Sequence, residues 1–369
     1  MSGRRVAVVG LLLALWGGAA SEARGQDSQF SLGGLGTPGR PEGVRARSTG
    51  GAFAPFDPAS PLVEAALADV TRLTASVMGT TSHRALDFDT TSAALRVSRF
   101  PVLVVSGGLR RGWVGSLGFS TYLDRSYRVV IRGDTILRGQ PEPFTDDLSS
   151  EGAVTDVRLA LARRLGRRLA IGAGFHLLVG STREQVSRDF ENPSYATSAQ
   201  RTEVFYNGLG ATASLMADPL AGVRLAGWLR SDSRLTTETE DAEVARNDLP
   251  VQAGAAVHWQ PRPFSRFAAS VAWSGWSVSA PDAFDTFNWS VGAEVGGSSL
   301  PLRLGVRGGR LPFGPGAEAP TELGAAIGTG LRVARGRGTL DLGVEYLRRE
   351  GPGLTERVWT VMLGVGIRP

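Results

Sequence analysis

The chain has 369 residues, no cysteine, a mean hydropathy of −0.03, and 40 basic against 35 acidic residues for a formal net charge of +5. The lack of cysteine excludes a disulfide framework, and a charge this small does not favour a nucleic-acid partner. Every one of the 40 basic residues is arginine, which excludes P-loop and Schiff-base chemistry based on lysine.

The first 25 residues have the pattern of a secretory signal peptide. Arg4 and Arg5 precede an apolar run over residues 6–20, and Ala23-Arg24-Gly25 places small residues at cleavage spacing. A retained membrane anchor is the alternative, but the run is shorter than the ~20 residues that a spanning helix needs. We therefore expect residues 1–25 to be a signal peptide, with cleavage before Gln26 or, alternatively, after Ala23.

The next segment, residues 26–60, is rich in glycine, proline and serine and has no sustained period of 2 or 3.6. This composition on its own indicates a disordered tail. Residues 61–69 (PLVEAALAD) can form a short helix.

From about residue 70 to the C-terminus the sequence alternates with a period of two, which predicts β-strands. In residues 167–180, the apolar Leu169, Ile171, Phe175 and Val179 share one face, and Gly172, Gly174 and His176 lie on the other. We expect fourteen such strands, over residues 70–79, 93–105, 112–132, 152–163, 168–187, 201–216, 221–231, 250–260, 265–279, 285–296, 300–312, 321–334, 338–349 and 355–368.

The connections between these strands alternate in length. Tight turns at 106–111, 163–168, 217–222, 261–265, 296–301 and 335–338 are rich in arginine, whereas the longest connections are 133–151, 188–200 and 231–249. This rhythm is typical of an up-and-down transmembrane barrel, in which the closed sheet pairs all of its backbone groups and lipid covers its apolar face. The predicted fold is therefore all-β, a transmembrane antiparallel barrel over residues 70–369.

Aromatic residues near the predicted strand ends are expected to form the interfacial girdles of such a barrel. They are Trp113, Tyr122, Trp259, Phe264, Phe267, Trp289 and Trp359.

Four motifs resemble the long-chain fatty acid transporter family of outer-membrane proteins. They are residues 30–36 (FSLGGLG), residues 50–60 (GGAFAPFDPAS), residues 165–174 (LGRRLAIGAG), and the C-terminal strand motifs 302–307, 311–313 and 339–346. Two positions depart from the family pattern. Ser60-Pro61-Leu62 replaces an Asn-Pro-Ala, and the chain ends in Gly366-Ile367-Arg368-Pro369 instead of an aromatic residue.

The resemblance implies a fourteen-stranded barrel whose lumen holds an N-terminal hatch, here residues 26–69. It implies passive uptake of hydrophobic small molecules, such as long-chain fatty acids, across the outer membrane of a Gram-negative bacterium. Lipid, the apolar ligand and the barrel-assembly machinery are then the expected partners. The hatch residues expected along the ligand path are Phe30, Leu32, Leu35, Phe53, Phe56 and Asp57. A secretion-associated or structural barrel, whose family shares the glycine-rich start, and an unspecialised porin are the alternatives.

The sequence offers little that points to catalysis or to a cofactor. The histidines His83, His176 and His258 are scattered, so we expect neither a metal site nor a hydrolase triad. The GxGxxG match at residues 34–39 follows no predicted strand and therefore does not indicate a dinucleotide site. We predict a protein that is not an enzyme and uses no cofactor.

Overall fold

The computed structural model describes residues 28–31, 33–60, 62–88, 91–240, 242–297, 300–314 and 316–368. The predicted signal peptide lies outside these residues. In the described part of the chain, no helix combines the length and apolar character needed to cross a membrane.

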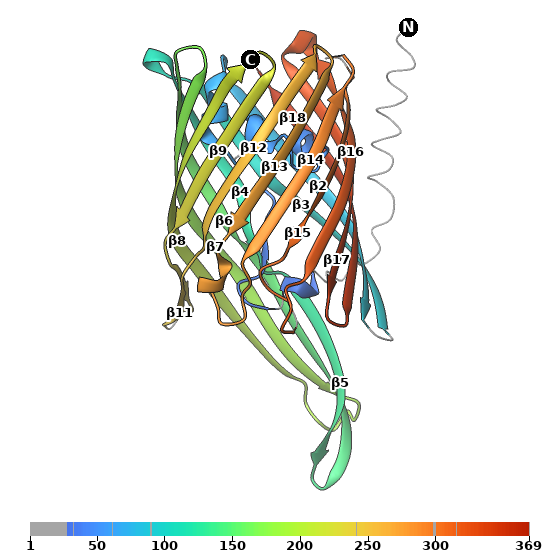
Figure 1. The fold of residues 1–369 in the computed structure, drawn as a ribbon. Coiled ribbons are helices and arrows are strands. Elements are labelled where there is room, and N and C mark those ends of the chain that lie inside the picture. The colour runs from blue at the N-terminus through green and yellow to red at the C-terminus, as the bar shows by residue number, and fades with distance from the viewer. Residues whose placement is uncertain are drawn as a thin grey trace.

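Fourteen antiparallel strands close into one barrel, which confirms the predicted number (Figure 1). Each strand pairs with its neighbour along the chain, and β18 closes the ring against β2 through pairs such as Val361 and Thr81. The strands of the ring are β2 (Thr74–Phe88), β3 (Thr91–Gly108), β4 (Trp113–Asp124), β6 (Gln140–Leu165), β7 (Leu169–Phe190), β8 (Ser198–Leu220), β9 (Val223–Asp232), β12 (Val251–Arg262), β13 (Ser265–Ser274), β14 (Thr286–Val295), β15 (Leu302–Arg310), β16 (Thr321–Val333), β17 (Gly338–Gly351) and β18 (Leu354–Ile367).

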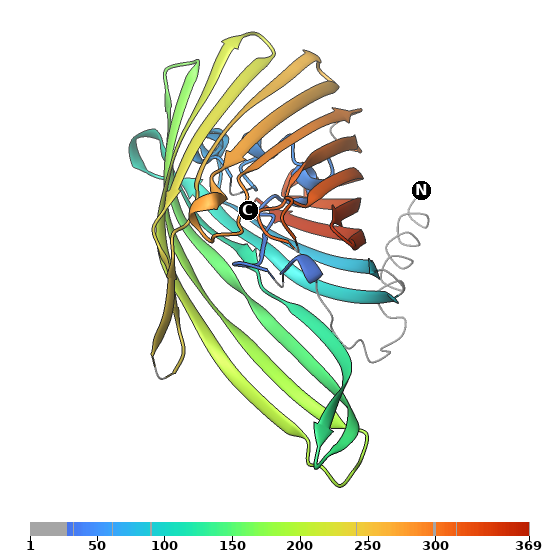
Figure 2. The ribbon, with the colours of Figure 1, turned by 60° about the horizontal axis from the view of Figure 1, so that its bottom comes forward.

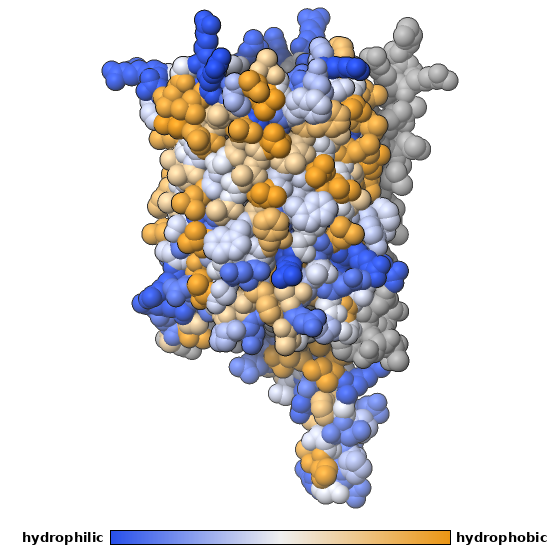
Figure 3. Space-filling model, viewed as in Figure 1, coloured by the Kyte–Doolittle hydropathy of each residue, from blue (hydrophilic) through white to orange (hydrophobic). Residues whose placement is uncertain are grey.

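The outer face of the barrel is apolar, as the alternation predicts. On β7, Ile171 and Phe175 are 36% and 49% exposed, whereas His176 on the opposite face is 2% exposed. On the face seen in Figure 3, apolar residues form a belt across the barrel, with charged residues above and below it. The expected girdle has one error, because Tyr122 points inward and its hydroxyl donates to Asp232 Oδ2 at 2.9 Å.

The long connections contain more regular structure than expected. Beyond the barrel, β6, β7 and β8 continue and are joined by β5 (Tyr127–Leu137) in a sheet that projects from the end with the long loops (Figure 1). The predicted strand 112–132 is therefore two strands, and much of the expected loop 133–151 belongs to β6. Both faces of this sheet are partly exposed, so its sequence lacks the clean alternation of the barrel. A small hairpin of β10 (Leu235–Glu238) and β11 (Glu243–Asn247) occupies the loop 231–249.

The N-terminal segment, residues 33–69, lies inside the barrel rather than as a detached tail (Figure 2). It contains β1 (Thr37–Pro38), α2 (Val44–Arg47), η2 (Ala54–Phe56) and η3 (Glu64–Asp69), preceded by η1 (Gln29–Ser31). The expected short helix over 61–69 is the 3-10 helix η3. The inward-facing glycines have a physical reason, because a Cβ on Gly305 would lie 2.0 Å from the backbone of Thr49. Short 3-10 turns complete the fold at η4 (Arg110–Gly112), η5 (Trp276–Val278) and η6 (Ala334–Gly336).

Candidate functional site

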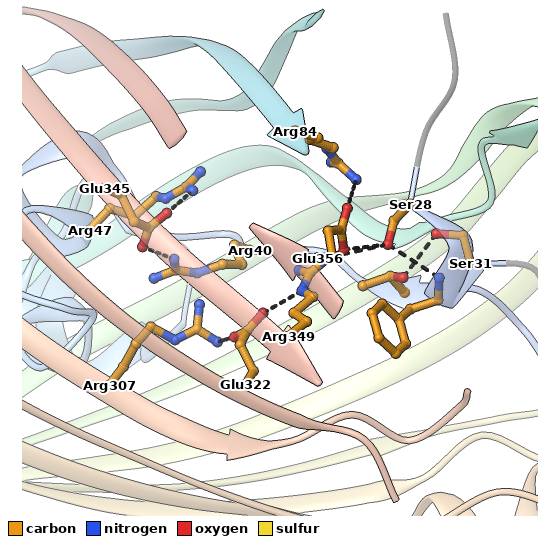
Figure 4. Close-up of polar contacts among 12 residues, drawn as sticks. Ser28, Ser31, Arg40, Arg47, Arg84, Arg307, Glu322, Glu345, Arg349 and Glu356 are labelled. Atoms are coloured by element: carbon orange, nitrogen blue, oxygen red, sulfur yellow. Dashed lines mark hydrogen bonds and ion pairs between the residues drawn. The ribbon is translucent and has the colours of Figure 1, made fainter. Parts of the chain in front are cut away.

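A network of arginine and glutamate side chains ties the N-terminal segment to one wall of the barrel (Figure 4). Arg40 precedes α2 and Arg47 ends it, and both guanidinium groups donate to Glu345 of β17. The Glu345 side chain is 1% exposed, so its charge is compensated by protein groups instead of water. Removing one partner of such a buried pair costs ~3–5 kcal/mol.

The same network continues across the wall through Arg349, also on β17. Its Nε donates to Glu322 Oε2 of β16 at 2.8 Å, and its Nη1 donates to Glu356 Oε2 of β18 at 3.2 Å. Ser28 donates to the same Glu356 oxygen at 2.8 Å, which holds the start of the described chain against β18. Arg307 pairs with Glu322 from the other side (Figure 4).

Two further ion pairs hold the N-terminal segment to the rest of the wall. Arg45 of α2 donates to both carboxylate oxygens of Glu294 on β14, at 2.9 and 3.0 Å. Glu64 of η3 accepts from Arg158 of β6 at 3.3 Å and from Ser214 of β8 at 3.0 Å. The segment is therefore anchored to strands on several sides of the barrel.

A row of polar side chains crosses β6 to β9 on the inner face. His176 Nδ1 lies 2.9 Å from both carboxylate oxygens of Asp156, and His176 Nε2 is hydrogen-bonded to Thr212. Arg230 Nη1 donates to Asp156 Oδ2 at 2.7 Å. No sequence motif marks this grouping, because its members lie on four strands. The backbone around Thr212 is engaged in the β7–β8 and β8–β9 ladders, so the row joins four neighbouring strands on the inner face.

The structure separates the predicted hatch residues into two groups. Towards the long-loop end, Phe30 packs with Leu311 and Leu354, and Leu35 joins an apolar cluster with aromatic members. Leu32 lies outside the described residues. The residues around Leu35 are Tyr122, Leu123, Val154, Leu178, Val204, Tyr206, Leu235, Leu249, Trp276, Ala283 and Phe313.

The second group lies towards the end with the tight turns. The rings of Phe53 and Phe56 contact His258, at centroid distances of 5.6 and 5.5 Å. Asp57 follows directly and is 5% exposed. Its Oδ1 accepts from the Ala59 backbone at 3.1 Å, and burial raises the pKa of this carboxyl above its ordinary value.

The second group lines a cavity, and the first group packs beside residues that line another. An inner cavity of about 240 Å³ lies between the N-terminal segment and the wall, and its lining includes Tyr122, Trp228 and Trp276 beside Arg230 and His176. A wider basin of about 1160 Å³ opens at the tight-turn end, where Phe53, Phe56 and Asp57 meet Arg167 and Arg168. The sequence did not mark the aromatic residues of the inner cavity, because they come from separate strands and loops.

The barrel wall is interrupted beside β3. Met78 pairs with Val102 and Thr80 with Arg99, so Phe100 and Pro101 bulge opposite Gly79. β3 pairs with β4 only from Val102 to Gly108, consistent with the missing N–H of Pro101. At the resulting wall gap, β1 takes the place beside β4, with Thr37 opposite Asp124.

The wall gap is closed by side chains. Arg99 of β3 donates to Asp124 of β4 across it. A cavity of about 100 Å³ lies behind this pair, lined by Pro38, Arg99, Pro101, Thr121 and Asp124 among others. The Arg99–Asp124 pair therefore separates the cavity beside β1 from the lipid-facing side of the barrel.

The described residues contain no group of three or more His, Cys, Asp or Glu side chains placed to hold a metal ion.

Comparison with known proteins supports the architecture. No protein-family model and no curated protein matches the sequence. Among solved structures, a FadL homologue from Pseudomonas aeruginosa matches at 13% identity and a TM-score of 0.64, covering 91% of this chain and 99% of that one. The toluene transporter TodX from P. putida matches at 13% identity and a TM-score of 0.60, covering 89% and 98%. The monoaromatic hydrocarbon channel CymD matches at 11% identity and a TM-score of 0.57, covering 91% and 98%. The chain therefore has the fold of the FadL and TodX transport barrels, which confirms the resemblance at the level of the fold.

Proposed function

We propose that this protein is a passive channel for hydrophobic small molecules in the outer membrane of a Gram-negative bacterium. The observation that carries the proposal is a lipid-facing barrel whose lumen holds its own N-terminal segment, described over residues 33–60 and 62–69, with cavities left beside it. This segment then acts as a hatch. The signal peptide and the barrel-assembly machinery deliver the chain, and transport needs no catalytic step and no cofactor.

The entry half of the path is the apolar cluster around Leu35 at the long-loop end. Tyr122 and Trp276 lie at a centroid distance of 6.5 Å, Trp276 and Phe313 at 5.5 Å, and the inner cavity begins beside them. An apolar ligand gains roughly 25 cal/mol for each Å² that it buries there. Phe30 precedes this cluster along the chain and belongs to the same entry half in our proposal.

Two exits follow from the cavities. The hatch residues Phe53, Phe56 and Asp57 border the basin at the tight-turn end, so a shift of η2 opens a route through the barrel. The wall gap at Pro101 offers a sideways route into the bilayer once the Arg99–Asp124 pair opens. A ligand that partitions into lipid favours the second route, because it avoids the charged basin.

The ligand class is apolar, with long-chain fatty acids and small hydrocarbons as the candidates. TodX and CymD are described as a toluene transporter and a monoaromatic hydrocarbon channel. A secretion-associated barrel and an unspecialised porin are the alternatives that the experiment must separate.

The test is whole-cell uptake of labelled long-chain fatty acid, and in parallel of labelled toluene, in a host that lacks its own transporter. Full-length protein is compared with a variant lacking residues 27–56 and with Arg99→Gln, after surface labelling confirms that each reaches the outer membrane. Hatch-dependent uptake supports the proposal. Equal uptake by the deletion variant indicates a plain porin, and no uptake of either compound by an inserted full-length barrel contradicts the proposal.

A further inference from the structure

The tight-turn end of the barrel carries a ring of exposed arginines, which we call the arginine collar. Its members lie at the start of β2, in the turns β3–β4, β6–β7, β12–β13 and β16–β17 and at the end of β18, whereas the turns 217–222 and 296–301 contain none. Blue side chains mark this end of the barrel at the top of Figure 3. Its members are Arg72, Arg110, Arg111, Arg163, Arg167, Arg168, Arg262, Arg332, Arg335, Arg337 and Arg368.

The collar charges are not neutralised by neighbouring carboxylates. The surface carboxylates of this end, Asp69 and Asp218, are each held by both Arg164 and Arg224, which lie outside the collar. None of the collar arginines forms an ion pair with a carboxylate in the described part of the chain. Arg163 is engaged differently, with its guanidinium 5.6 Å from the centroid of the Trp113 ring.

The opposite end of the barrel has a different character. Some of its exposed arginines pair with exposed carboxylates, such as Arg234 with Asp248 at 2.8 Å and Arg246 with Glu243 at 2.8 Å, whereas others, such as Arg132 and Arg183, form no ion pair among the described residues. The two ends therefore differ in their carboxylates: exposed carboxylates lie among the arginines of the long-loop end, whereas Asp69 and Asp218 at the tight-turn end are already held by Arg164 and Arg224.

Large exposed apolar side chains lie directly beside the collar. Leu73, Leu109 and Phe264 are 56%, 55% and 63% exposed, and each is within two residues of a collar arginine. Leu165, Leu331, Val333 and Ile367 also lie within two residues of a collar arginine, and Leu220 and Leu300 are exposed in the two turns that have none. A ligand that matches both the arginines and the apolar side chains beside them has an anionic head group next to an apolar tail.

We propose that the arginine collar binds the head groups of anionic phospholipids in the leaflet at the tight-turn end. Cationic side chains next to a membrane surface attract anionic lipids, and guanidinium groups match phosphate geometry with paired N–H donors. The collar arginines lie at separate turns spread along the rim, so they fit a lipid annulus better than a protein partner, which would cover one side. The inference concerns lipid contacts and does not depend on transport.

Tryptophan quenching tests the proposal. Purified full-length protein is inserted into vesicles of phosphatidylcholine mixed with phosphatidylglycerol, with bromine on the acyl chains of one lipid or the other. Trp259, which is 52% exposed and three residues from Arg262, reports on the lipid beside the collar. Subtracting the quenching of Trp259→Phe protein isolates its signal.

The expected result is several-fold stronger quenching of Trp259 by brominated phosphatidylglycerol than by brominated phosphatidylcholine, with the preference reduced by salt. The collar variant combines Arg111→Gln, Arg262→Gln, Arg335→Gln and Arg337→Gln and should lose the preference. The matched control replaces four arginines at the long-loop end, Arg132, Arg138, Arg183 and Arg201, by Gln and should keep it.

Equal quenching by the two lipids in the parent protein overturns the proposal. So does a preference that survives in a collar variant whose heat-modifiable gel mobility shows a folded barrel. Loss of the preference in both variants also counts against it, because a general loss of positive charge then explains the effect.

Discussion

Glu345→Gln tests whether buried ion pairs hold the N-terminal segment in the lumen. The amide cannot compensate the charges of Arg40 and Arg47, which both donate to this carboxylate. Breaking a buried pair costs ~3–5 kcal/mol. Arg40 still pairs with Glu42 at 3.3 Å after the substitution, so its charge stays partly compensated. We therefore expect a cost at the lower end of that free-energy range. At 1.4 kcal/mol for each factor of ten, the population with a detached segment rises by about 100-fold.

Hydrogen exchange of peptides covering residues 40–56, followed by mass spectrometry of the protein in detergent, measures this population. Exchange in Glu345→Gln should be about 100-fold faster, and conductance in planar bilayers should rise. The matched control is Glu350→Gln on the same strand, because Glu350 pairs with Arg348 at a half-exposed position and such a pair contributes at most ~1 kcal/mol. Equal exchange in the two variants would refute the reasoning.

Three further predictions follow from the same contacts. Gly305→Val should displace the N-terminal segment, because even a Cβ would lie 2.0 Å from the Thr49 backbone, and single-channel conductance should increase in an otherwise folded barrel; unchanged conductance would contradict the close approach. Because burial raises the pKa of Asp57, attachment of the segment should be strongest at low pH and should weaken as the pH rises through that raised pKa. Hydrogen exchange of the segment, measured as a function of pH, should show this dependence in the parent protein and no dependence over the same pH range in Asp57→Asn. Cysteines at positions 99 and 124, cross-linked across the wall gap, should abolish hydrophobic uptake and recover it on reduction, whereas uptake that persists in the cross-linked form would exclude the sideways exit.

The strand number, the direction of the side chains and the side with the tight turns are all local properties. A period of two, interrupted by turn residues, can be recognised in a single segment without knowing which strand pairs with it. Ile171 and Phe175 of β7 therefore face outward as predicted. The projecting sheet escaped prediction because both of its faces are partly exposed, so the sequence carries no strict alternation there.

The site depended on tertiary structure for a different reason. Tyr122 and Trp276 meet beside Leu35 only because the barrel closes around the N-terminal segment, and the expected hatch residues divide between two ends of that segment. Glu345 and Arg47 are 298 positions apart, and no local pattern can pair them. The sequence by itself determined a lipid-facing barrel, because side-chain alternation is written along each strand. Only the tertiary structure decided which charges meet in the lumen and where the wall opens, because those contacts depend on strand register and on the path of the chain inside the closed ring.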